Sequence, residues 1–171
     1  MSDRLTVIAG PKVYSSLKRR FSSLCFGTIK VAQSSAVSSE DAVMNPREVA
    51  RAARRSIETA QERLLHGDTL LVFAEGTRSR TRGLQPLLPA ASRYFDVPGV
   101  CVLPAGITGT EDMFPIGEDG LHPVQAIATI GAPMDASALL EQANGDRRVM
   151  MDSVGAKIAA LLPPEYRGEY S

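Results

Sequence analysis

A short run of small and charged residues, from Phe73 to Arg80, has the composition of a phosphate-binding loop. The glycine, Gly76, lets a ligand approach the backbone closely. The guanidinium of Arg78 presents a planar set of donors that matches two phosphate oxygens at once. Thr77 and Ser79 add hydroxyl donors. Together these residue types suit a phosphate monoester.

The acid of this run, Glu75, repels a phosphate, so we expect it to hold an arginine or a ligand hydroxyl in place. The ordinary alternative is a turn in which Arg78, Arg80 and Arg82 are solvated surface charges. From the residue types alone, both interpretations stay open.

The run is placed where a predicted strand ends. Residues 69–74 (TLLVFA) are apolar over the length of a strand, and they follow a predicted helix directly. That helix has Asn45 as its cap, Pro46 at its first position and Glu48 three residues after the cap, and Gly67 ends it. This order of elements predicts an α/β domain with a largely parallel sheet, in which ligands bind at the carboxyl ends of strands.

Apolar spacing predicts the other elements of the chain. Helix 46–66 should bury Val49, Ala53, Ile57, Ala60 and Leu64 on one side. Strands are expected over residues 5–9, 27–31, 100–107 and 124–130. Pro104 predicts an irregularity in the third of these, and residues 124–130 are expected to form the final strand. Helices are expected over residues 14–26, 86–95 and 146–162, the last capped by Asp146 and burying Val149, Met150, Val154, Ile158 and Leu161.

Length and composition favour one domain, because 171 residues of 44% apolar composition can bury one core. No run approaches the roughly 20 apolar residues of a membrane span, so a soluble or peripheral protein is expected. The two cysteines, Cys25 and Cys101, are expected to be buried and reduced, which fits a reducing cytoplasm.

Charge is distributed unevenly along the chain. Residues 1–39 hold six basic residues and one acid, whereas residues 101–171 hold four basic residues and ten acids. The basic amphipathic helix over residues 14–26 could lie on an anionic membrane surface. A helix that packs on its own core, and a solvated charge pattern without function, are the commoner explanations.

The run from Phe73 to Ser79 resembles the F-P-E-G-T-R-S block of the glycerolipid and lysophospholipid acyltransferases, with Ala74 in place of the usual proline. Two weaker blocks flank it in the expected order, at residues 27–31 and 102–107. The resemblance spans most of residues 5–130. It implies a single glycerol-phosphate acyltransferase-like α/β domain over residues 1–171, amino-terminally truncated, with a core of about 5–130 and a helical extension of about 135–171.

The resemblance also implies a binding site for the acceptor phosphate. The family's block assigns this role to Glu75, Gly76, Thr77 and Arg78, with Ser79 completing the motif. Lys12 looks like the family's basic residue that faces the same phosphate. The block at residues 27–31 departs further, with Lys30 where an aromatic residue is common and Gln33 near a frequent arginine.

The implied reaction moves a fatty acyl group from an acyl thioester to a lysophospholipid or glycerol-phosphate hydroxyl, in phospholipid synthesis. The implied partners are a thioester donor (acyl-CoA or acyl-carrier protein), a phosphate-bearing lipid acceptor and an anionic membrane surface. No cofactor, metal or nucleic acid is expected. The expected location is cytoplasmic and peripheral, at the inner face of the cell membrane.

The family's catalytic H-x-x-x-x-D motif is missing from this sequence. Leu71 stands five residues after His66 and Ile127 five after His122, so neither histidine forms it. His66 is expected to cap a helix end. Either the sequence starts at an internal methionine, or the chain is a shortened, inactive relative. The first is favoured, because a phosphate pocket without its base has little use.

Two other classes of function are compatible with a phosphate-binding loop or a basic helix. A non-catalytic phospholipid-binding or regulatory module on membranes would use the helix over residues 14–26. A soluble phosphosugar or nucleotide enzyme also needs a phosphate loop, but the sequence has no G-x-x-x-x-G-K-[ST] run, no G-x-G-x-x-G run and no carboxylate cluster for magnesium.

Overall fold

The computed structural model describes residues 4–9, 27–30, 45–77, 79–113 and 122–171. The chain divides into two compact units, and each is described by itself. The first unit comprises Met1–Phe73 with Arg93–Val97, and the second comprises Ala74–Ser92 with Pro98–Ser171. The predicted helix over residues 14–26 lies outside the described residues.

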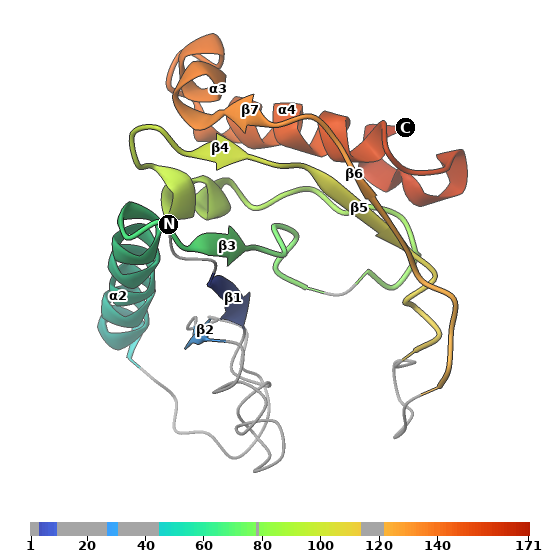
Figure 1. Ribbon diagram of the computed structural model, residues 1–171, viewed down its shortest axis with the longest axis horizontal. Coiled ribbons are helices and arrows are strands. Elements are labelled where there is room, and N and C mark those ends of the chain that lie inside the picture. Colours follow the sequence, from blue (N-terminus) through green and yellow to red (C-terminus); the bar gives the residue numbers. More distant parts are fainter. Residues whose placement is uncertain (1–3, 10–26, 31–44, 78, 114–121) are drawn as a thin grey trace. The chain divides into compact units, whose positions relative to one another are not determined.

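The first unit contains a three-stranded parallel sheet and a long helix (Figure 1). Its strands are β1 (Leu5–Ala9), β2 (Thr28–Lys30) and β3 (Thr69–Leu71), with β1 in the centre. β1 pairs in parallel with both neighbours. Strands were predicted at all three places, but β3 ends at Leu71 instead of Ala74, since its pairing with β1 stops at Leu71 and a turn follows over Ala74 and Glu75.

Helix α2 (Pro46–Leu65) begins with the predicted capping box. The backbone N–H of Asn45 donates to Glu48 Oε2 at 3.2 Å, and the Asn45 side chain accepts from backbone N–H groups of the first turn. His66 caps the carboxyl end, with Nδ1 2.6 Å from the carbonyl oxygen of Glu62, as predicted. Of the predicted buried positions Ala60 is fully buried, whereas the others are half-buried; the polar Ser56 is buried as well.

The second unit holds two antiparallel strand pairs. β4 (Cys101–Val102) pairs with β7 (Met134–Asp135), and β5 (Ala105–Thr108) pairs with β6 (Ile127–Ile130). The predicted irregularity at Pro104 is the break between β4 and β5. The strand predicted over residues 124–130 begins only at Ile127. It is also not the last strand, because β7 follows it.

Helices make up most of the rest of the described chain. They are α3 (Ala136–Gln142), α4 (Arg147–Ala159) and the 3₁₀ helices η2 (Pro89–Phe95), η3 (Pro164–Tyr166) and η4 (Gly168–Tyr170). The helix predicted over residues 86–95 is thus a shorter 3₁₀ helix. Pro89 lacks the N–H that would extend an α-helix backwards. The Ser92 hydroxyl donates to the Pro89 carbonyl at 2.7 Å within this turn.

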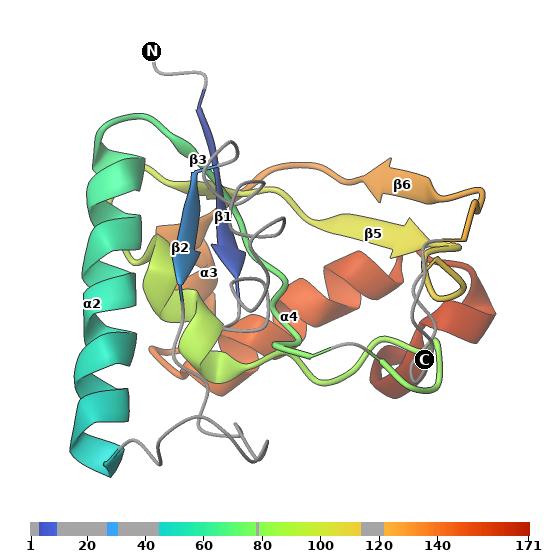
Figure 2. The ribbon, with the colours of Figure 1, turned by 90° about the horizontal axis from the view of Figure 1, so that it is seen from below.

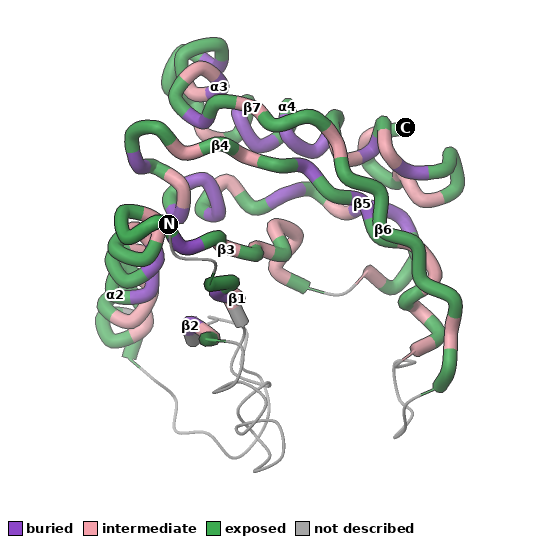
Figure 3. Tube along the Cα trace, viewed as in Figure 1, coloured by how far each residue is buried: buried purple, intermediate pink, exposed green. Residues whose placement is uncertain are grey.

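Helix α4 supplies much of the buried core of the second unit (Figure 3). Asp146 caps it, as predicted, by accepting from the N–H groups of Arg148 and Val149. Met151 is 1% exposed, but Val149, which the pattern placed inside, is 48% exposed. The buried stripe is therefore rotated relative to the prediction. It comprises Met150, Met151, Val154, Gly155 and Ala159.

The carboxyl-terminal segment pairs with residues 84–87 through its backbone and one side chain. The N–H of Leu84 donates to the carbonyl of Tyr166 at 2.9 Å, and the N–H of Glu169 donates to the carbonyl of Leu84 at 3.1 Å. The hydroxyl of Tyr170 accepts from the N–H of Leu87 at 3.1 Å. These bonds fix the stretch of chain that follows the predicted phosphate-binding run.

One prediction about cysteines is wrong. Cys101 is a free and exposed thiol, because β4 is only two residues long and Cys101 lies on its exposed side. Cys25 lies outside the described residues. In the described ranges no helix has the length and apolar character needed to cross a membrane. The same ranges hold no group of three or more His, Cys, Asp or Glu side chains able to bind a metal ion.

Candidate functional site

The predicted phosphate-binding residues form a loop that begins three residues after β3 ends. At the start of this loop the carbonyl of Ala74 accepts from the N–H of Leu88 at 2.9 Å. Gly76 has a φ angle of +69°, which side-chain-bearing residues adopt only with strain. A Cβ atom at this position would also overlap the side chain of Leu88. Both observations explain why the motif has glycine here.

Glu75 braces the loop from within. Its carboxylate accepts a hydrogen bond from the backbone N–H of Gln85 at 2.9 Å. Burial raises the pKa of Glu75, and the bond from Gln85 opposes that rise. The sequence predicted an arginine or a ligand hydroxyl as the partner, whereas the described partner is a main-chain donor.

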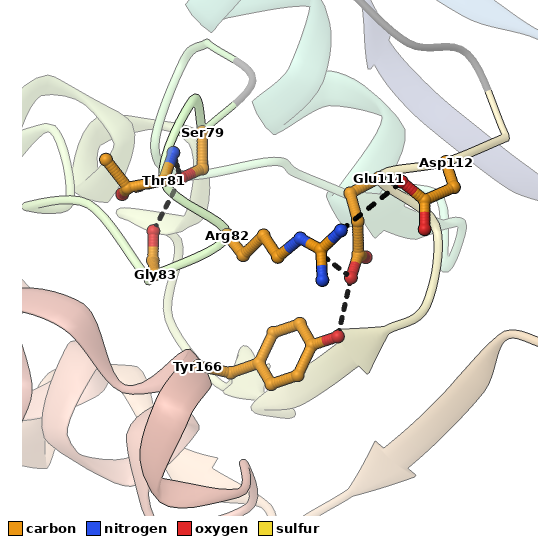
Figure 4. A network of polar contacts seen from close by, with 7 residues as sticks. All are labelled: Ser79, Thr81, Arg82, Gly83, Glu111, Asp112 and Tyr166. Carbon is orange, nitrogen blue, oxygen red and sulfur yellow. Dashed lines mark hydrogen bonds and ion pairs between the residues drawn. The ribbon is translucent and has the colours of Figure 1, made fainter.

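Ser79 also uses its hydroxyl inside the loop (Figure 4). Its Oγ donates to the carbonyl of Gly83 at 2.7 Å and accepts from the N–H of Thr81 at 3.2 Å. The side chain of Gln85 donates to the same Gly83 carbonyl at 3.1 Å. Thr77, in contrast, is exposed. Of the two hydroxyls in the motif, the Thr77 hydroxyl is therefore the better placed for a ligand.

A cluster of charges, which the sequence analysis missed, anchors the far end of the loop. Arg82 lies 3.7 Å from Glu111 and 3.4 Å from Asp112, and the hydroxyl of Tyr166 donates to Glu111 at 2.6 Å (Figure 4). The bond from Tyr166 lowers the pKa of Glu111, and the same bond raises the pKa of Tyr166. Arg82 itself has a φ angle of +66°, which is unusual for a residue other than glycine.

The structure thus brings four of the six predicted residues, Glu75, Gly76, Thr77 and Ser79, into one loop. Arg78 and Lys12 lie outside the described residues. Arg82, which the ordinary-turn interpretation made a solvated charge, is ion-paired instead. No local signal could have found that pairing, because Glu111 and Asp112 are about thirty positions away in the sequence. A role of the loop residues in acceptor binding remains a prediction.

Comparison with known proteins gives one match to a family model and one match to a solved structure. A model of the family described as "Acyltransferase" matches residues 25–108, a range that includes the whole loop. The 1-acyl-sn-glycerophosphate (LPA) acyltransferase PlsC from Thermotoga maritima has a similar crystal structure, with a TM-score of 0.59 and 20% identity. That match covers 93% of this chain and 66% of the other, so this chain spans about two thirds of the length of that protein. Among curated proteins, none matches the chain.

The matched sequence range and the shared fold together define an acyltransferase-type α/β protein with a parallel sheet and helices. Within that class, they support the resemblance to the glycerolipid acyltransferases that the block from Phe73 to Ser79 indicated. The predicted fold class and the resemblance stated from the sequence are confirmed.

Proposed function

We propose that this protein takes part in the transfer of a fatty acyl group from an acyl thioester to the hydroxyl of a lysophospholipid or glycerol phosphate. The loop of Glu75 to Ser79 would hold the phosphate of the acceptor. The observation that carries this proposal is the construction of that loop. Gly76 has a positive φ angle, and the Glu75 carboxylate and the Ser79 hydroxyl are hydrogen-bonded to the main chain within the loop. Thr77, in contrast, is exposed.

The chemistry also needs a general base to take the proton of the acceptor hydroxyl. His66 lies at the end of α2 with its ring against the Glu62 carbonyl, and neither histidine of the sequence has an aspartate five residues later. We therefore propose that the base belongs to a segment outside these 171 residues. Reading the coding DNA upstream of Met1 tests this, since an in-frame H-x-x-x-x-D supports it and a nearby stop codon counts against it.

Acceptor binding can be tested on this chain directly, because it does not require the base. Arg78→Ala removes charge-assisted hydrogen bonds worth about 1.5–3 kcal/mol, so affinity for glycerol 3-phosphate or lysophosphatidate should fall by about tenfold or more. Isothermal titration calorimetry measures the change. Arg80→Ala is the matched control, because Arg80 is an exposed arginine of the same loop and stands outside the F-x-E-G-T-R-S motif.

Equal affinity in wild type and Arg78→Ala would remove Arg78 from the site. Equal losses in the Arg78 and Arg80 variants would show a diffuse electrostatic effect in place of a phosphate contact. Glycerol, which lacks the phosphate, should give no measurable heat with any of the three proteins.

A membrane-associated position fits the lipid acceptor. We propose an anionic membrane surface, at the inner face of the cell membrane, as the place where this protein meets its acceptor. Liposome sedimentation tests this with anionic and neutral vesicles. The triple variant Lys18→Glu, Arg19→Glu, Arg20→Glu should lose binding to anionic vesicles. Undiminished binding would exclude the segment 14–26 as the contact.

A further inference from the structure

A groove in the first unit carries charges that the proposed acceptor site does not use. It has a volume of about 720 Å³ and is lined by residues of helix α2 and of strands β1 and β2. The two strands lie beside α2 in the fold of this unit (Figure 2). Three arginines of α2 line it, namely Arg51, Arg55 and Arg63. Thr6 and Thr28 line it from the strands, and Ser56 and Thr59 from the helix.

The charge in this groove is not balanced by its own lining. The acid among the lining residues, Glu48, already accepts from the N–H of Asn45 in the capping box. Arg63 lies 3.6 Å from the buried carboxylate of Asp68, so that one arginine is held in position. Arg51 and Arg55 form no ion pair with any other residue that the structure describes. Among the described residues that line the groove, three arginines face one carboxylate, which is an excess of positive charge.

The spacing of the arginines suits an extended anion. Arg51 and Arg55 are one helical turn apart on the same face of α2, which places their Cβ atoms about 6 Å from each other. Each guanidinium can donate two parallel hydrogen bonds to a phosphate. Threonines of two strands contribute to the lining on the sheet side. A ligand with several phosphates and a polar body fits this arrangement better than a single phosphate does.

We propose that this groove binds the nucleotide end of coenzyme A, the 3′-phosphorylated adenosine diphosphate of the acyl donor. The inference rests on the proposed function, because a thioester donor is what the acyl transfer requires. The volume of the groove lies within the range of small-molecule sites, about 300–1,000 Å³, so it can hold a nucleotide. Arg51 and Arg55 hold the phosphates, while Asp68 positions Arg63.

Calorimetric titration of the whole chain with coenzyme A, adenosine 3′,5′-bisphosphate, pantetheine and inorganic phosphate tests the proposal. Coenzyme A and the bisphosphate should bind, and pantetheine, which lacks the nucleotide, should not. Arg55→Ala should weaken binding by about tenfold, and the double variant with Arg51→Ala should weaken it further. Arg54→Ala is the matched control, because Arg54 lies outside the groove lining and bonds to Glu58 at 2.7 Å. It should change affinity less than about twofold.

Equal losses in the Arg54 and Arg55 variants would overturn the proposal, and so would equal binding of coenzyme A and pantetheine. Inorganic phosphate that binds as tightly as the bisphosphate would reduce the groove to a general anion site. Binding of an acyl-carrier protein that depends on Arg55, without binding of coenzyme A, would also overturn it. Failure of the proposed function is distinguishable, because acceptor binding depends on Arg78 and is measured with glycerol 3-phosphate alone.

Discussion

Arginines of the two units are used in different ways. Arg82, at the end of the loop, lies within 4 Å of both Glu111 and Asp112, and Glu111 is in turn held by Tyr166. Arg55 of α2 faces a groove in which the nearby acid, Glu48, is already engaged. A cation whose donors are used by neighbouring acids contributes to local structure, whereas a cation in a concave site without such acids is available for a ligand.

This difference concerns more than the two arginines. In the loop, polar side chains are hydrogen-bonded to nearby main chain, as Glu75 is to Gln85 and Ser79 is to Gly83. Changes to these hydrogen-bonded residues should act first on stability. Changes in the groove should act first on ligand affinity and leave stability almost untouched. The contrast gives four predictions, in order of decreasing effect.

The largest effect on stability is expected for Gly76→Ala. The positive φ angle and the overlap with Leu88 should together cost about 1–3 kcal/mol in the free energy of unfolding. Urea denaturation measures it. Gly99→Ala is the control, because Gly99 has a φ angle of +77° but no atom near the position of a Cβ. Equal losses in the two variants would mean that Leu88 moves aside without cost.

Tyr166→Phe should destabilise the second unit to a smaller extent, because it removes the hydrogen bond to Glu111. The pKa of Glu111 should also rise, since that bond is the main cause of its lowering. A double-mutant cycle with Glu111→Ala, followed by urea denaturation, isolates the coupling of the pair. A coupling energy of zero would show that the loop end does not depend on this contact.

Glu75 gives a smaller effect that depends on pH. Its folded-state pKa is raised, so the protonated carboxyl is favoured in the folded protein, and this contribution is lost as pH rises through the folded pKa. Glu75→Gln keeps an acceptor for the N–H of Gln85 but does not titrate. The stability of wild type relative to the variant should therefore decrease from pH 4 to pH 7 in urea denaturation. A difference that stays constant with pH would contradict the effect of burial.

Arg55→Ala should change the free energy of unfolding by less than about 0.5 kcal/mol, which is the smallest effect of the four. Its side chain is exposed and forms no ion pair within the described parts of the chain. Thermal denaturation of Arg55→Ala and Arg82→Ala side by side tests the contrast. A larger loss for Arg55 than for Arg82 would reverse the assignment of the two regions.

Elements with a local chemical signal were predictable from the sequence. The capping box of Asn45 and Glu48 gave the start of α2, Asp146 gave the start of α4, and Pro104 gave the break between β4 and β5. Each signal consists of residues within one turn or one strand. The loop from Phe73 to Ser79 could likewise be recognised, because its block is contiguous, while its role in acceptor binding stays a prediction.

Features that depend on contacts distant in sequence were not predictable. The ion pairs of Arg82, the bond from Gln85 to Glu75 and the exposure of Cys101 depend on which segments pack together. Strand β7 is too short to give a periodic signal of its own. The groove was also missed, since the spacing of Arg51 and Arg55 shows a helix face but not the threonines of β1 and β2 opposite them.

The bonds of Tyr166, Glu169 and Tyr170 to residues 84–87 have a practical consequence for protein production. Trimming these final residues to obtain a smaller crystallisation target would leave the main chain of Leu84 and Leu87 without these partners. The motif loop precedes that stretch directly, so a shortened protein would have a less supported loop without any change in the motif. Versions that lack residues 166–170 should therefore not be used to test the proposed ligand binding.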